Sequence, residues 1–161
     1  MSMKSDLYDE MEQLCKDAVG NYKVETVNSD DTRIREKKEF SFYTSQLPER
    51  KPDIHFCPYV LIVIPDRKGD DDEAENMANV VILVSVANTD PEKNHRIDAE
   101  LITGFIYDRI FKNRMLGKFT LKPPVYEMTP LNDNSLVATG EINATYNVLT
   151  IDDTDVLDAI S

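Results

Sequence analysis

Residues 90–116, with the sequence DPEKNHRIDAELITGFIYDRIFKNRML, form the segment around which the rest of the chain is arranged. Asp90 and Pro91 are a typical N-cap and first helical residue, so they predict that a long helix begins there. Apolar residues then recur every three or four positions, as on one face of a helix. A long apolar strand pattern precedes this helix at 77–87, and another follows it at 135–151.

The apolar side chains of this central helix cover more of its circumference than one sheet face requires. At about 100° per residue they span roughly 220°. Either the fold surrounds the helix, or part of the band contacts another subunit. We take Ile102, Ile106 and Ile110 as candidate residues of a subunit interface. Gly104 predicts close approach of another backbone, because glycine inside a helix costs about 1 kcal/mol relative to alanine. The band contains Ile97, Leu101, Ile102, Phe105, Ile106 and Ile110.

The segments before the central helix predict an N-terminal helix and several strands. Residues 5–18 have helical apolar periodicity, and 22–27 and 38–44 read as short strands. Residues 59–65 are almost continuously apolar, which is typical of a strand buried on both faces. Together with 77–87 they predict an antiparallel hairpin. The expected fold class is α+β, with a mixed, mostly antiparallel sheet packed against an N-terminal helix and one long central helix.

The segments after the central helix predict further strands of the same sheet. Residues 119–121 and 125–128 read as short strands separated by a break at Pro123–Pro124. The alternating pattern of 135–151 exceeds the usual 3–10 residues of a strand. It therefore predicts either a bend at Gly140 or an extension past the sheet edge toward a neighbour.

Length and composition predict one domain over residues 1–161, with an acidic and extended C-terminal tail at 152–161. Hydrophobic residues make up 41% and charged residues 30%, which is typical of neither a disordered chain nor a membrane protein. We expect no signal peptide and no membrane partner. The net charge of −12 argues against a general phosphate-backbone binder. Cys15 and Cys57 predict reduced, packed thiols of a cytosolic protein.

Residues that commonly carry chemistry are few. His55 and Cys57 lack the further ligands that a metal site needs, so a loop histidine and a packed thiol are the more economical interpretation. His95 has no nucleophile in a recognisable motif beside it. We therefore predict no catalytic residue, no cofactor and no metal site, and expect that the protein is not an enzyme.

An acidic run in the loop between residues 66 and 76 is the most conspicuous charged segment. It lacks the regular spacing with which an EF-hand loop wraps Ca²⁺. A solvated loop is the default interpretation of such a run, and the alternative is a loop that faces a channel or a charged partner. The run contains Asp70, Asp71, Asp72, Glu73 and Glu75.

Four segments, in order, resemble the tail terminator proteins of long-tailed phages and of their prophage and tailocin relatives. The first is the apolar strand, charged tip and return strand CPYVLIVIPDRKGDDDEAENMANVVILVSVA, and the second is the helix NHRIDAELITGFIYDRIFKN. The third is RMLGKFTLKPPVYEM, and the fourth is the late strand GEINATY. Together they cover residues 57–151. They are patterns of hydrophobicity and turns rather than catalytic signatures.

The resemblance implies structural work in a virion, at the head-proximal end of the tail, for a protein made in the host cytoplasm. The resemblance implies a compact α+β subunit with a sheet flanked by helices. Such subunits assemble into a ring, usually a hexamer, on the last ring of the tail tube. The implied partners are other copies of the chain, the tail tube protein and the head–tail connector protein, with the tail sheath as a further candidate. DNA would pass through the lumen without specific binding, and the acidic run would face the lumen or an adjacent ring.

Two other functions stay open on the sequence. A head–tail connector or another tail-completion protein would share the phage setting but occupy a different position. A metal-dependent hydrolase built on the acidic loop would be an enzyme, and replacing Asp70, Asp71 and Asp72 with alanine would then abolish its turnover. Loss of a measurable activity in that triple variant would exclude the structural interpretation.

Overall fold

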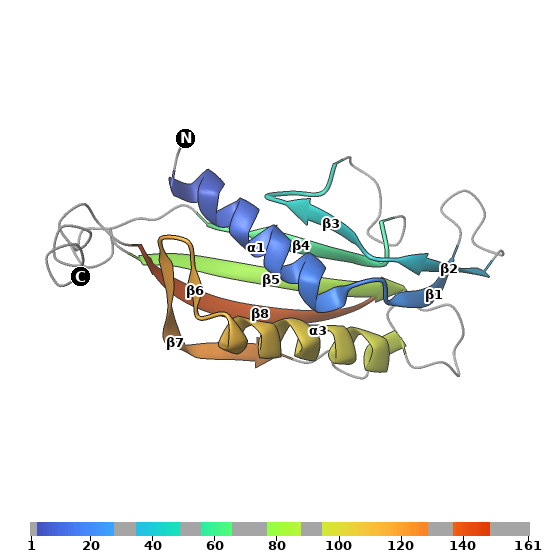
Figure 1. The fold of residues 1–161 in the computed structure, drawn as a ribbon. Helices are drawn as coiled ribbons and strands as arrows, with labels where there is room; N and C mark the ends of the chain where they lie inside the picture. Colours follow the sequence, from blue (N-terminus) through green and yellow to red (C-terminus); the bar gives the residue numbers. More distant parts are fainter. Residues whose placement is uncertain are drawn as a thin grey trace, which may run out of the picture.

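The computed structural model describes residues 3–27, 35–48, 56–65, 77–87, 95–128 and 137–148. Two helices cover one face of a six-stranded sheet, and a two-stranded ribbon lies at one end (Figure 1). The strand order in the sheet is β3-β4-β5-β8-β7-β6, with β3 and β4 parallel and the other described neighbours antiparallel. The predicted α+β class, with its mixed and mostly antiparallel sheet, is confirmed. The elements are α1 (Met3–Val19), β1 (Lys23–Val27), β2 (Arg35–Glu39), β3 (Ser41–Thr44), β4 (Tyr59–Val63), β5 (Met77–Ala87), α3 (His95–Lys112), β6 (Met115–Leu116), β7 (Phe119–Met128) and β8 (Val137–Val148).

The centre of the sheet is the antiparallel pair β5–β8. Its register runs from Met77 opposite Asn147 to Ala87 opposite Val137, so β5 is paired along its whole length. The predicted antiparallel pairing of β4 with β5 is confirmed. Of the two alternatives for the long strand at 135–151, an extension past the sheet edge is not seen in the described part of β8, because β5 pairs with it on one side and β7 on the other. The extra length of β8 therefore serves pairing within the subunit.

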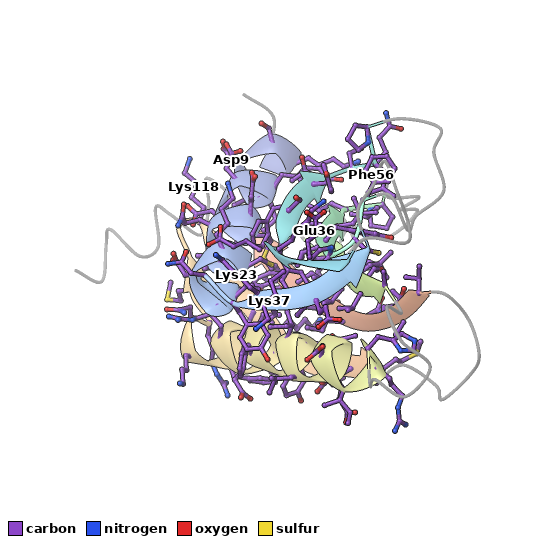
Figure 2. The ribbon with its side chains drawn as sticks, turned by 90° about the vertical axis from the view of Figure 1, so that its right-hand side faces the viewer. Asp9, Lys23, Glu36, Lys37, Phe56 and Lys118 are labelled. Atoms are coloured by element: carbon purple, nitrogen blue, oxygen red, sulfur yellow. The ribbon has the colours of Figure 1, made fainter. Side chains whose placement is uncertain are left out.

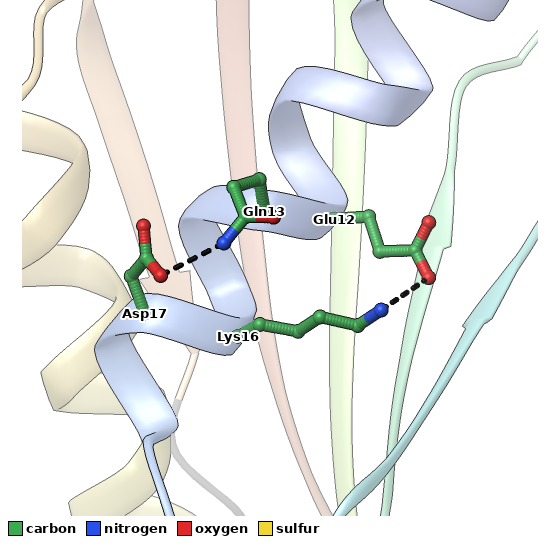
Figure 3. Close-up of polar contacts among 4 residues, drawn as sticks. All are labelled: Glu12, Gln13, Lys16 and Asp17. Atoms are coloured by element: carbon green, nitrogen blue, oxygen red, sulfur yellow. Dashed lines mark hydrogen bonds and ion pairs between the residues drawn. The ribbon is translucent and has the colours of Figure 1, made fainter.

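Helix α1 packs its apolar stripe on the sheet, as the periodicity of residues 5–18 predicts. Leu7 and Met11 are almost completely buried, while the outer side carries polar pairs one turn apart. Gln13 Nε2 donates to Asp17 Oδ1 over 2.9 Å, and Lys16 Nζ lies 3.2 Å from Glu12 Oε1 (Figure 3). Such exposed pairs stabilise a helix by only a few tenths of a kcal/mol each. Burial of the inner stripe therefore holds α1 in place.

The segment 38–44, predicted as one strand, is divided between two sheets. Arg35–Glu39 pairs antiparallel with β1 in the ribbon, whereas Ser41–Thr44 pairs parallel with β4 in the main sheet. The division falls at Phe40, which is buried in the core with only 6% of its surface exposed. Burial of the Phe40 side chain anchors the chain to the core at this point. The charged residues of β2, which precede it, pair with β1 in the ribbon instead. The prediction of a single strand was wrong for that reason.

Helix α3 lies against β5, β7 and β8 on the same face as α1. Gly140 of β8 permits this close approach, because a Cβ there would overlap Thr103 Oγ1 and lie 3.1 Å from Thr103 Cβ. Thr103 Oγ1 also donates a hydrogen bond to Ala99 O, which holds the side chain in place. Gly104, by contrast, has open space where its Cβ would be. The close approach within the subunit is therefore made at Gly140, and its assignment to Gly104 is not supported.

Strand β7 passes through two prolines without leaving the sheet. Its pairing with β8 is regular up to Lys122, shifts register, and resumes at Tyr126. The predicted break at Pro123–Pro124 therefore becomes a bulge-like irregularity within one strand. Proline is tolerated here because the opposite side of this part of β7 is a sheet edge, beyond the short β6.

Candidate interaction surfaces

The three residues predicted to form a subunit interface lie instead in the subunit core. Ile102, Ile106 and Ile110 each have 0% of their surface exposed. They occupy the side of α3 that faces the sheet, where Ala99 and Thr103 are also buried. A neighbouring subunit has no access to these side chains in this fold. The other three residues of the predicted apolar band, Ile97, Leu101 and Phe105, are the exposed ones.

The outward side of α3 carries the other half of the apolar band. Ile97, Leu101 and Phe105 follow one another at intervals of four residues, and we name these three residues the α3 stripe. Their exposed fractions are 49%, 40% and 37%, respectively. Tyr22 packs edge-to-face against Phe105, with ring centroids 6.2 Å apart and an interplanar angle of 79°. This contact holds one end of the stripe in a fixed position at the surface.

Gly104 lies on the same outward side, one helical turn from Leu101 and from Asp108. Apart from its chain neighbours and the backbone of its own helix, no described residue has an atom within 4 Å of the position that its Cβ would occupy. The subunit therefore gains no packing from this glycine, although glycine inside a helix is unfavourable by about 1 kcal/mol. The missing side chain leaves a shallow gap in the helix surface beside the exposed side chain of Leu101.

Three carboxylates lie beside the α3 stripe. Glu100 and Asp108 are exposed, and Glu127 of β7 lies near both of them. Partial burial raises the pKa of Glu127, and the negative charges of Asp108 and Glu100 raise it further. Within the described part of the chain, neither Glu100 nor Asp108 forms an ion pair. Glu100, Asp108 and Glu127 therefore place negative charges beside the stripe, while Arg96, Arg109 and Lys112 are the basic residues of the same helix.

A second surface has the opposite charge. Residues 109–126 contain five basic residues and no acid, in a chain that has 30 acids overall. We name residues 112–122, which include β6, the turn and the start of β7, the basic hairpin. Its Met115 is 64% exposed, the largest exposed fraction among the large apolar residues together with Tyr126. The five basic residues are Arg109, Lys112, Arg114, Lys118 and Lys122.

The basic hairpin projects at the opposite end of the sheet from the first turn of α3 (Figure 1). Its turn lies next to α1, because a Cβ on Gly117 would be 3.2 Å from Glu10 Oε1. Lys118 lies away from the β1–β2 ribbon that carries Lys37 (Figure 2). Lys112 and Lys118 form no ion pair with the described residues. Their charges are therefore available to a partner.

The sheet face opposite the helices contains a shallow groove of about 480 Å³. Its floor is formed by neutral side chains of β5 and β8, among which Thr145 Oγ1 donates to Asn79 Oδ1 over 2.9 Å. Tyr126 is the one titratable residue that lines it. The groove therefore offers no acid–base pair. The lining residues are Pro65, Asn79, Val80, Val81, Pro124, Tyr126, Asn143, Ala144 and Thr145.

Most of the residues that commonly carry chemistry lie outside the part of the chain that the structure describes. The acidic run with Asp70, Asp71, Asp72, Glu73 and Glu75 lies outside the described residues, as do His55, the helix cap predicted at Asp90–Pro91 and the tail 152–161. Cys15 and Cys57 are buried and form no disulfide in the described part of the chain, and burial raises the pKa of Cys15 far above its usual range. Over the described ranges, no group of three or more His, Cys, Asp or Glu side chains is placed to hold a metal ion.

His95 begins α3 and is half-buried, and its Nδ1 has no hydrogen-bond partner among the described residues.

Neither helix that the structure describes has the length and hydropathy needed to cross a membrane. Comparison of the chain with protein-family models and with curated protein sequences finds no match.

Sequence reasoning missed the basic hairpin, although its signal is present in the sequence. The acid-free stretch of residues 109–126 is unusual in a chain with a net charge of −12. The α3 stripe was within the predicted apolar band, but periodicity does not indicate which part of a broad band meets the sheet. That information comes from the position of α3 in the fold.

Proposed function

We propose that this chain is a structural virion protein of the tail-terminator type. It forms a ring on the end of a phage tail tube, ends polymerisation of the tube and provides the docking surface for the head-side connector. On this proposal its partners are further copies of itself, the tail tube protein and the connector protein. DNA passes through the lumen of the ring, and the protein performs no reaction.

One observation carries most of the proposal. The four segments that resemble tail terminators fall on elements that are neighbours in space. They supply β4, β5, β8, β7 and β6, which are consecutive strands of the sheet, and α3, which covers them. A resemblance limited to scattered surface segments would carry far less weight. The described chain is thus an α+β subunit of the kind that the resemblance implies.

The surfaces of the subunit also favour assembly. An exposed apolar stripe and a separate basic hairpin provide two different patches, as a head-to-tail ring requires. The net charge of −12 suits a lumen through which DNA moves without adhering. A terminator differs from other ring proteins because it sets the length of the tail, so the decisive test measures tail length.

Electron microscopy of particles that lack this protein tests the proposal. We expect tails of uncontrolled length, because the tube continues to polymerise when its terminator is missing. Tails of normal length that fail to attach to heads would contradict the proposal and would favour a head–tail connector. Restoring the wild-type protein should restore a single tail length. Pull-down with tube subunits, compared with head-side proteins, discriminates a tail terminator from a head–tail connector.

A further inference from the structure

We propose that the α3 stripe of one subunit receives the basic hairpin of a second copy of this chain, as the repeating contact of the ring. This inference rests on the proposed function, because it assigns the surfaces through which the ring forms. It involves side chains on two separate parts of the subunit. The stripe supplies Ile97, Leu101 and Phe105, and the hairpin supplies Met115, Lys118 and Lys122.

Charge is the first reason to choose a second copy as the occupant. Two subunits that each carry −12 repel one another unless their contact places basic groups against acidic groups. Glu100 and Asp108 flank the stripe, and neither forms an ion pair in the described part of the subunit. Lys118 of the hairpin is likewise without an ion pair there. Contact between the two surfaces would complement both sets of charges.

Apolar complementarity is the second reason. Leu101 and Phe105 are exposed by 40% and 37%, and Met115 by 64%, so each loses contact with water when another apolar surface covers it. Met115 has an unbranched side chain that adapts to an irregular surface. Gly104 leaves a gap between Leu101 and Asp108, and outside the helix backbone no described residue lies within 4 Å of the position of its Cβ. A side chain or backbone from another subunit can enter that gap.

The position of the two surfaces determines the kind of assembly. The hairpin lies at one end of the sheet, and the first turn of α3 lies toward the other end (Figure 1). A contact between two different surfaces is heterologous, and it produces a closed ring or an open filament. An isologous dimer would instead place two α3 stripes against each other and would stop at two copies. The stoichiometry of the assembly therefore separates these arrangements.

Charge reversal on each surface tests the contact in the full-length chain. We expect Lys118→Glu with Lys122→Glu to weaken assembly by at least about tenfold, as measured by native mass over a dilution series. Glu100→Lys with Asp108→Lys should weaken it similarly. The protein with all four substitutions should assemble again, because the complementary charges are restored in exchanged positions. Lys37→Glu, on the ribbon, is the matched control and should assemble like wild type (Figure 2).

Gly104→Gln separates assembly from folding. Glutamine is a better helix former than glycine, and its Cβ meets no atom of the same subunit within 4 Å. We therefore expect an unchanged or higher melting temperature together with loss of assembly, because the side chain fills the gap that the second copy occupies. A thermal unfolding scan of every variant distinguishes lost contact from lost structure.

The assembly experiments can contradict the proposed contact without contradicting the proposed function. Wild-type rings together with normal rings of both charge-reversed variants would overturn the inference and leave the proposed function intact. A dimer that depends on the stripe but not on Lys118 would also overturn it, in favour of an isologous contact. Normal assembly combined with loss of DNA binding in Lys118→Glu would reassign the hairpin to nucleic acid. A wild-type protein that stays monomeric would overturn both proposals.

Discussion

The two faces of α3 contain similar residues but have different environments. Ile102, Ile106 and Ile110 are completely buried against the sheet, whereas the α3 stripe is 37–49% exposed. Both faces belong to one apolar band in the sequence. The difference arises because the sheet and α1 together cover only part of the helix circumference. Apolar residues that the subunit does not cover are the ones available to a partner, so the exposed half of the band carries the functional information.

Truncation of one residue on each face gives the largest expected contrast. Ile106→Ala should reduce the free energy of unfolding by about 2–5 kcal/mol, because it leaves a cavity in the core. Leu101→Ala should change it by less than about 1 kcal/mol, because that side chain is partly solvated and alanine favours the helix. Chemical denaturation of both variants at concentrations that keep the protein monomeric measures this difference. Equal losses would show that the two faces are not distinct.

Gly140 tests the close packing of the inward face. Gly140→Ala should destabilise the subunit by about 1–3 kcal/mol, because the new methyl group overlaps Thr103, whose hydroxyl is held by Ala99 O. The melting temperature of the purified variant measures the effect. Adding Thr103→Ala removes the hydroxyl that overlaps the new methyl group and should recover part of the lost stability. A melting temperature equal to that of wild type would contradict the tight approach of α3 to β8.

Gly104 is the matched position on the outward face, and alanine there should change the stability of the monomer in the opposite direction. Gly104→Ala should stabilise the monomer by about 1 kcal/mol, because alanine favours the helix and its Cβ meets no atom within 4 Å. The same thermal or chemical unfolding experiment measures it. A destabilised monomer would mean that the space above Gly104 is occupied within the subunit, and the contrast between the two glycines would fail.

Glu127 gives the smallest effect, and it depends on pH. Its pKa in the folded protein is raised by partial burial and by Asp108 and Glu100. The folded state therefore binds this proton more tightly than the unfolded state, and the associated stability is lost as the pH rises through the raised pKa. Glu127→Gln should give a small increase in melting temperature at pH 7 and none at pH 3. A constant difference between variant and wild type at both pH values would contradict this.

Local sequence signals predicted the parts of the fold that depend on periodicity and on turn residues. The apolar stripe of α1, the β4–β5 pairing and the alternation of β8 follow directly from the positions of their apolar residues. The division of 38–44 at Phe40 did not, because the choice between two sheets depends on where the core lies. Likewise, helix propensity drew attention to Gly104, whereas the glycine that allows close packing is Gly140, whose partner Thr103 is distant in the sequence.

The candidate surfaces show the same limit. Helical periodicity placed every residue of the α3 stripe in the apolar band. The interface prediction nevertheless chose Ile102, Ile106 and Ile110 from that band. Only the position of the sheet shows that these three are inaccessible. The basic hairpin is different, because its charge can be read from the sequence. Its position relative to Glu100 and Asp108 of α3 requires the fold. A surface formed by two distant segments requires both kinds of information.

The native mass of the purified full-length protein tests the central claim most directly. A tail-terminator subunit with complementary head-to-tail surfaces should form a closed ring of identical copies, and the resemblance implies a hexamer. We therefore expect a discrete species at six times the subunit mass, together with the same protein in intact particles. A strict monomer at every concentration, absent from intact particles, would contradict the account.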